Sequence, residues 1–275
     1  MLWSTPLLLY SCDALAWGLY THVYFAQQLV WAIPLADPRF RRAARALPGW
    51  LMAGACLPDL SLTGHHAGAG EFRDTHQWDG ALAMLEHAGS DEERALALGF
   101  ACHLLVDIIA HNHYVPAHEK MWPNIPLLTH AACEWAMDAH IRPHVIAAPA
   151  QLLRQHRHGL KLFSAAHFRS GHEPTMRALK LLADADALLR RSRLSEALYH
   201  TGKLLDRNLK RRCNYYLRET SRRLVQINQM LEGRLPAWHA EPPLPELVHE
   251  RLGLHTPRQI RYHLPLPLDL FLEAK

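Results

Sequence analysis

An apolar stretch from Ala95 to Pro116 constrains the fold more than any other part of the chain, because ligand-type side chains interrupt it. His103 and Asp107 are four residues apart, and His113 follows six residues later. A helix turns about 100° per residue, so a spacing of four places two side chains on one face, one turn apart. A helix that is apolar nearly all round is buried, and a buried aspartate is costly unless it is paired or bound to a metal ion. The stretch therefore predicts a buried helix that carries a metal site.

The segment HAACEWAMDAHI, expected to begin after a Thr129 cap, repeats this spacing on a second helix. His130 and Glu134 are four residues apart in it, and Asp138 continues their face. A single pair of this kind can be a capping or helix-surface pair. Two pairs of imidazole and carboxylate on buried helices instead favour a shared metal site, since both groups are zinc ligands.

Histidine is enriched in the chain. The 275 residues include 21 histidines, and ten of them lie between His65 and His140, around the two predicted ligand helices. Histidine is not among the commonest residues of globular proteins, so its enrichment supports metal binding. The net charge of +4 is too small to indicate a nucleic-acid or membrane partner. The five cysteines are scattered and form no CxxC motif, so no disulfide is expected, and Cys102 and Cys133, on apolar helices, are expected to be small buried thiols.

The remaining sequence predicts an all-α fold, because no segment shows the period-two alternation of strands. The glycine- and histidine-rich residues 60–73 are expected to form a loop, Asp91 to cap the central helix and Pro116 to end it. Long amphipathic segments follow Pro149, so we expect a core of residues 17–148 with a helical C-terminal extension of residues 149–275 packed on it. The other expected helices cover residues 17–30, 39–47, 49–57, 78–88, 149–169, 174–192 and 194–232.

Residues 1–16 are expected to be removed as a signal peptide. Their apolar run is short and no Lys or Arg precedes it, but Ala14-Leu15-Ala16 is an A-x-A cleavage pattern that would leave Trp17 as the N-terminus. Two alternatives are a lipoprotein site at Cys12 and an uncleaved apolar segment. Cleavage would place the protein in the periplasm or outside the cell. No later stretch reaches the roughly 18 apolar residues of a membrane span, so none is expected in the mature chain.

Nine residues make up the candidate ligand set. They comprise the two helix pairs, the histidine that follows the first pair, and four positions at the new N-terminus, on the first helix or at predicted turns. In chain order the set is Trp17 (through a free N-terminal amine), His22, Asp59, His76, His103, Asp107, His113, His130 and Glu134. Oxygen and nitrogen donors without a thiolate suit a hydrolytic zinc site better than a closed structural one.

The order of these residues resembles the zinc-dependent phospholipase C family of bacteria and the related P1/S1 nucleases, which prefer single strands. The resemblance covers roughly the first half of the chain, and its most specific part is the H-x3-D-x5-H element followed by H-x3-E. The matching motifs are Trp17-Gly18…His22, Pro58-Asp59, Thr75-His76, His103-x3-Asp107-x5-His113 and His130-x3-Glu134.

The resemblance implies a multi-helix bundle with up to three zinc ions held among buried helices. Asp59, His76, His103 and Asp107 would surround one ion, and His113, His130 and Glu134 a second. Trp17 would chelate the third through its backbone amine and carbonyl, with His22 and a bridging Asp107. Asp59 and Asp107 are the expected catalytic residues, and in some family members the residue matching Asp59 is viewed as a general base.

The function implied is zinc-dependent hydrolysis of a phosphodiester, with phospholipid head groups as the expected substrate and a metal-activated hydroxide as nucleophile. One alternative is a nuclease acting on single-stranded nucleic acid, which would need stacking aromatics and a basic groove. Another is a non-catalytic helical scaffold stabilised by zinc.

The motifs do not separate phospholipase from nuclease. His22 lies five residues after Trp17, which is the nuclease-like spacing, whereas Pro58-Asp59 and Glu134 look more like the phospholipases. The interval from His76 to His103 is shorter than in either group. Substrate loops are therefore expected to differ from both.

Overall fold

The computed structural model describes residues 18–122, 126–237, 250 and 253–262. Within these residues every regular element is a helix, which confirms the all-α prediction. The expected signal peptide and Trp17 lie outside the described residues.

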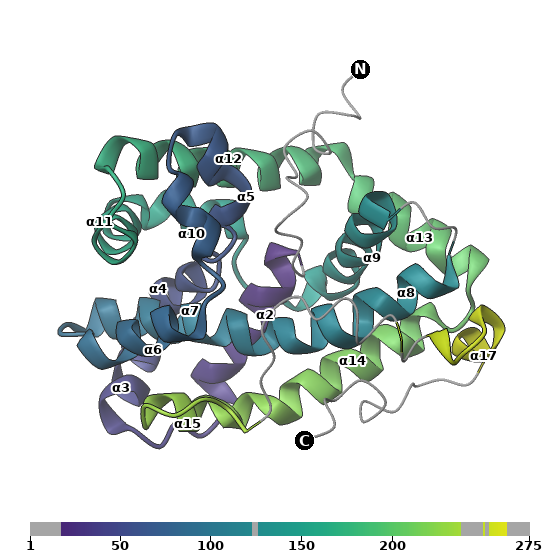
Figure 1. Cartoon of the computed structure of the whole chain (residues 1–275), viewed down its shortest axis with the longest axis horizontal. Helices are drawn as coiled ribbons and strands as arrows, with labels where there is room; N and C mark the ends of the chain where they lie inside the picture. Colours follow the sequence, from purple (N-terminus) through teal and green to yellow (C-terminus); the bar gives the residue numbers. More distant parts are fainter. Residues whose placement is uncertain (1–17, 123–125, 238–249, 251–252, 263–275) are drawn as a thin grey trace.

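The first part of the chain supplies the elements that carry the candidate ligands. These are α2 (Leu19–Trp31), α3 (Pro38–Ala46), α4 (Pro48–Gly54), α5 (Leu60–Ala67), η1 (Gly70–Asp74), α6 (Trp78–His87), α7 (Asp91–Ile109), η2 (Ala110–Tyr114), α8 (Val115–Met121), α9 (Pro126–Ile141) and η3 (Arg142–His144). Helices α2, α7 and α9 come together near the middle of the molecule (Figure 1).

The second part of the chain packs on the first. Its elements are α10 (Pro149–Gln155), α11 (Arg157–Phe168), α12 (His172–Ser192), α13 (Leu194–Leu205), α14 (Leu209–Arg223), η4 (Leu224–Gln226), α15 (Ile227–Leu231) and α17 (Pro257–Tyr262). Helix α10 contacts α4, α12 contacts α5, and α13 contacts α9. The division into a core of residues 17–148 and an extension of residues 149–275 stays a prediction.

Helix α7 is the central element, and every residue from Ala95 to Ile109 is buried. Its N-cap is Ser90 rather than the predicted Asp91. The Ser90 hydroxyl accepts the backbone N–H of Glu93, and the Glu93 carboxylate accepts the backbone N–H of Ser90 in return. This capping box satisfies two backbone donors at once, whereas the charge of Asp91 pairs with Arg42 and Arg94.

The prediction that Pro116 ends the central helix is wrong. The chain continues from α7 through a π-helical turn, η2, into α8, and Pro116 lies in the first turn of α8. A π turn shifts the backbone hydrogen-bond register, and the first turn of a helix does not use the amide hydrogen that proline lacks. The run Asp91–Met121 is long and apolar enough to cross a membrane by length and composition, yet 94% of its most apolar window is buried inside the fold.

Two glycines allow α4 and α7 to approach each other closely. A Cβ on Gly99 would lie 2.0 Å from the carbonyl oxygen of Leu51, and a Cβ on Gly54 would lie 2.4 Å from that of Leu96. Because His103 lies one turn beyond Gly99, this contact brings the end of α4 against the His103 ring.

The loop predicted at residues 60–73 is mostly helical, as α5 and η1. Leu60, Leu62 and Phe72 are buried there, and α5 packs on α12. The glycine content predicts a loop, but the burial of these apolar side chains stabilises helices instead. The helix expected at 194–232 is likewise divided, with a break between α13 and α14 at the buried Asp206. The Asp206 carboxylate accepts the backbone N–H of Asn208 and pairs with the buried Arg212.

Four cysteines lie in the described residues, and all four are buried free thiols: Cys56, Cys102, Cys133 and Cys213. For Cys102 and Cys133 this confirms the prediction of small buried thiols.

Candidate metal centre

Four of the predicted ligands converge on a fifth, Asp107. His22 comes from α2, Asp59 precedes α5, His76 lies between η1 and α6, and His103 shares α7 with Asp107. The distances from Asp107 are 3.3 Å between Oδ1 and His22 Nε2, 3.5 Å between Oδ2 and His76 Nε2, and 3.0 Å between Oδ2 and His103 Nε2. Asp59 Oδ1 lies 4.0 Å from His103 Nε2. Residues far apart in sequence therefore meet as the ligand hypothesis requires.

Two overlapping groups of donors are compact enough for a metal ion. His22, Asp59 and His103 form one, and His76, His103 and Asp107 form the other, each with ligand atoms within 4.8 Å of one another. The His22 and His103 rings stack with centroids 3.5 Å apart. Stacking fixes the direction in which both rings present their nitrogens.

The tautomer of His103 follows from its backbone contact. Its Nδ1 lies 2.8 Å from the carbonyl oxygen of Ala55, at the end of α4. A carbonyl only accepts, so Nδ1 carries the proton and donates it. In the neutral ring Nε2 then holds a lone pair, directed at Asp107.

His76 is fixed in the same way through Thr75. The Thr75 hydroxyl donates to the carbonyl oxygen of Pro58 at 2.6 Å, so it can only accept from His76 Nδ1 at 3.2 Å. His76 Nε2 is therefore also a lone-pair nitrogen, and it lies 3.3 Å from His103 Nε2. Backbone carbonyls, directly or through one hydroxyl, orient both histidines, as the outer partners of metal-ligating histidines do.

The result is a buried cluster of acceptors that face one another. Asp59 Oδ1 and both oxygens of Asp107 accept no hydrogen bond from the described residues. Lone pairs and carboxylate oxygens at these distances repel unless a cation or protons lie between them. The nitrogen and oxygen donors fit Zn²⁺, which takes such ligands in open catalytic sites.

Burial sets the protonation of this cluster. It raises the pKa of Asp107 to about 7 and that of Asp59 to about 7, where the charge of Asp107 adds to the rise and His103 opposes it. Burial lowers the pKa of His76 to about 4, with repulsion from His103 as the next cause. Burial also lowers the pKa of His103, so near neutral pH His76 and His103 are unprotonated and can bind a cation.

A second pair lies on α9, where His130 Nε2 is 3.1 Å from Glu134 Oε1. Glu119 of α8 accepts from the other nitrogen, His130 Nδ1, also at 3.1 Å. Burial lowers the pKa of His130, but the two carboxylates outweigh it and raise that pKa to about 10. Burial raises the pKa of Glu134 to about 7, against the opposing charge of His130. This pair can therefore bind a cation only in exchange for protons.

The remaining predicted ligands stand as follows. His113 is fully buried on η2, and burial lowers its pKa to about 3. The compact donor groups found in the described part of the chain include neither His113 nor the His130–Glu134 pair. The three-residue second zinc site stays a prediction, as does ligation by Trp17.

Two residues outside the nine predicted ligands shape the site. No sequence pattern marks Glu119 as a site residue, because a single glutamate in a short polar segment is common. Asp138 continues the His130–Glu134 face, and its carboxylate accepts the backbone N–H groups of Tyr20 and Thr21, which begin α2. A Cβ on Gly18 would lie 2.1 Å from Asp138 Oδ2, so only glycine fits there. Asp138 thereby fixes the turn that precedes His22.

We expect Glu119→Gln to weaken zinc binding at the α9 pair by about 10- to 100-fold, the usual cost of losing a carboxylate that orients a ligand histidine. Zinc titration with a competing chelator measures this effect. Glu86→Gln, on the exposed face of α6, is the matched control and should leave the affinity unchanged. Equal affinities for both variants would remove Glu119 from the site.

Zinc binding should release protons and strengthen as pH rises from 6 to 8. Asp59, Asp107 and Glu134 have pKa values of about 7 and His130 of about 10, so all four hold protons near pH 6. Each proton displaced increases the apparent affinity about tenfold per pH unit. Calorimetry in two buffers of different ionisation enthalpy counts these protons. A pH-independent affinity would mean that zinc binds elsewhere.

Comparison with known families gives one match. A family model described as zinc dependent phospholipase C matches residues 21–223. No curated protein and no solved structure matched the chain. The match confirms the resemblance proposed from the ligand motifs, and it extends beyond the first half of the chain into α14. Because it spans both ligand helices and well over half of the sequence, the chain belongs to the zinc-dependent phospholipase C family.

Proposed function

We propose that the protein hydrolyses the phosphodiester bond between the glycerol and the head group of phospholipids, using zinc held by the Asp107 cluster. The observation that carries the proposal is the convergence of three acceptor atoms that face one another: His76 Nε2, His103 Nε2 and Asp107 Oδ2. Zinc bound there would supply an activated water nucleophile and would neutralise charge on the phosphoryl oxygens.

The protein groups would hold the reacting parts and move protons. Asp59 is 2% exposed and has a pKa of about 7, which suits a group that accepts a proton near neutral pH. His76 and His130 keep about 17% of their side chains exposed, whereas His22, His103 and Asp107 are buried. A phosphate group would therefore approach past His76 and His130.

His111 of η2 lies at the same edge. Its ring centroid is 5.9 Å from that of His130. Burial, then repulsion from His130, lowers its pKa well below the usual range. A neutral His111 imidazole at this place would contact the substrate without adding a positive charge that competes with the zinc for the phosphate.

The test is an assay of the zinc-loaded protein on a phosphatidylcholine analogue and on single-stranded DNA. We expect release of phosphocholine and diacylglycerol, loss of release with EDTA, and recovery with Zn²⁺. Cleavage of the DNA alone would replace the proposal with a nuclease. Full zinc content with no cleavage of either would favour a zinc-stabilised scaffold.

The proposed third zinc ion depends on N-terminal processing, because a backbone amine binds zinc only when it is free and unprotonated. We propose cleavage before Trp17 and a secreted or periplasmic location. N-terminal sequencing of the protein recovered from its native host tests this: a mature chain beginning at Trp17 supports it. A chain beginning at Met1 would exclude amine ligation.

A further inference from the structure

The corner between α13 and α14 (residues 204–218, called here the α13–α14 corner) carries a concentrated positive charge. A groove of about 550 Å³ lies along it. Asn214 and Tyr215 also line the groove, and among the described residues no carboxylate does. The five cations that line it are Arg207, Lys210, Arg211, Arg212 and Arg218.

Three of these cations lack an ion-pair partner in the part of the chain that the structure describes. Arg207, Lys210 and Arg211 are exposed and form no ion pair with any residue that the structure describes. Arg212 differs, because it is buried and paired with Asp206. Other exposed cations of the described chain do meet a carboxylate. Examples are the pairs Arg39–Asp37, Arg42–Asp91 and Lys180–Asp184.

Two leucines at the same corner are exposed to solvent. Leu204 is 85% exposed and Leu205 is 64% exposed, in the last turn of α13. Exposed leucines gain free energy when an apolar phase covers them. An anion in solution or a nucleic-acid strand would satisfy the cations but leave the leucines in water. A bilayer that contains anionic lipid satisfies both.

We propose that the α13–α14 corner docks the protein on anionic lipid bilayers, with Leu204 and Leu205 entering the interface and Arg207, Lys210 and Arg211 contacting lipid phosphates. The inference goes beyond the proposed function, because it concerns a binding surface that needs no zinc.

The corner is joined to the candidate metal centre through α9. Asn214 of α14 contacts His140 of α9, with Oδ1 2.7 Å from Nε2. His140 lies ten residues after His130, which is about 15 Å along a helix. Docking at the corner would therefore bring the bilayer close to the helix that carries His130 and Glu134.

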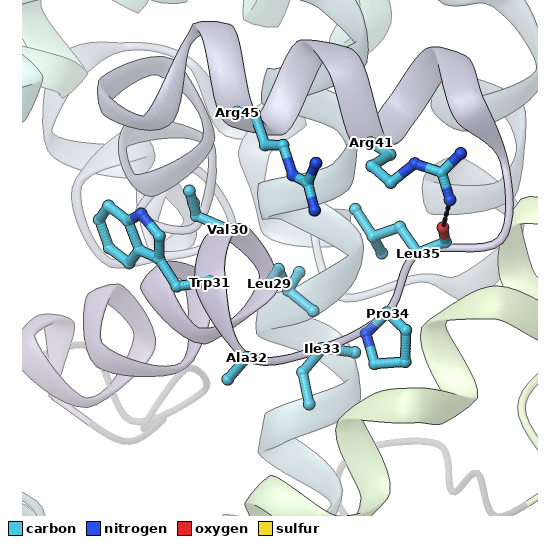
Figure 2. A pocket seen from close by; sticks show the side chains of 9 residues that line it. All are labelled: Leu29, Val30, Trp31, Ala32, Ile33, Pro34, Leu35, Arg41 and Arg45. Atoms are coloured by element: carbon cyan, nitrogen blue, oxygen red, sulfur yellow. Dashed lines mark hydrogen bonds between the residues drawn. The ribbon is translucent and has the colours of Figure 1, made fainter.

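A smaller hollow at the α2–α3 turn is the rival surface. Figure 2 shows Trp31, Arg41 and Arg45 around it, and Trp31 is 62% exposed. It has only two cations, however, and Arg41 already donates to the carbonyl oxygen of Leu35 at 3.1 Å (Figure 2). The α13–α14 corner is the stronger candidate, because it has three exposed cations without an ion pair to any described residue.

The test is co-sedimentation of the full-length, zinc-stripped protein with vesicles of phosphatidylcholine alone or mixed equally with phosphatidylglycerol. We expect binding to the mixed vesicles that weakens as salt is added. Arg207→Gln, Lys210→Gln and Arg211→Gln together should weaken it by about 100-fold, since each juxtamembrane cation contributes about fivefold. Leu204→Ser with Leu205→Ser should weaken it by about tenfold or more.

The matched control removes three exposed cations that have carboxylate partners, through Arg39→Gln, Arg73→Gln and Arg222→Gln. It should change vesicle binding by less than about threefold. Thermal melting checks that each variant is folded.

Four results would overturn the proposal. They are no binding to mixed vesicles, equal losses in both triple variants, unchanged binding after the leucine changes, and a loss confined to Trp31→Ser with Arg41→Gln and Arg45→Gln. Since the protein is zinc-stripped, none of these results depends on catalysis, so failure here leaves the proposed hydrolase untouched.

Discussion

Asp107→Asn is expected to reduce kcat/KM for phosphodiester hydrolysis by about a thousandfold or more, because losing even an outer partner of a ligand costs about 10- to 100-fold. Its two oxygens face His22, His76 and His103 at 3.3, 3.5 and 3.0 Å. An amide offers one oxygen and an NH₂ group, so it cannot serve cations on both sides. Steady-state rates together with zinc content per chain measure the effect.

Glu134→Gln is the comparison within the site. It alters one pair on α9, where His130 and Glu119 remain, so it should remove less zinc and less activity than Asp107→Asn. Asp184→Asn, on the exposed part of α12, should have no effect on either. Equal and mild losses in the two site variants would contradict the proposed bridging role of Asp107.

Removal of zinc is expected to lower the melting temperature by about 10 °C. Without a cation the buried acceptors of Asp59, Asp107, His76 and His103 face one another uncompensated. A ligand present at about a thousand times its dissociation constant stabilises the native state by roughly 4 kcal/mol. For a domain of about 150–250 residues, each kcal/mol corresponds to roughly 2–4 °C.

Differential scanning calorimetry with and without EDTA, followed by added Zn²⁺, measures this shift. Mg²⁺ in place of Zn²⁺ is the control, since a site with several imidazoles does not suit that ion. A melting temperature that does not respond to EDTA would show that the cluster is satisfied without metal.

The ligand cluster could largely be predicted from the sequence, because its strongest part depends on local geometry. His103 and Asp107 are four residues apart on an uninterrupted apolar helix, so their shared face follows from helix periodicity. The convergence of His22, Asp59 and His76 on that face is a tertiary contact. Only the order of motifs, through the family resemblance, anticipated it.

The features that were missed depend on contacts between distant residues. The tautomer of His103 is set by the carbonyl of Ala55, which reaches it because Gly54 and Gly99 let two helices approach closely. Glu119 meets His130 because the π turn at 110–114 carries the chain past Pro116 without a break. Neither contact leaves a pattern in the sequence of its own segment.

Local rules also failed where burial opposed them. Glycines in residues 60–73 predicted a loop, but Leu60, Leu62 and Phe72 fold into the core. The amphipathic pattern over 194–232 is continuous and gives no indication of the helix break at Asp206, whose carboxylate accepts the backbone N–H of Asn208. In both places side-chain burial or pairing outweighed backbone propensity.

Anomalous X-ray diffraction at the zinc edge, on crystals of the zinc-loaded protein, tests the central claim most directly. We predict a peak within the cluster of His76, His103 and Asp107, with zinc about 2.0–2.1 Å from both Nε2 atoms. Crystals grown with zinc that show no peak there, and a direct hydrogen bond between His103 and Asp107 instead, would contradict the metal centre.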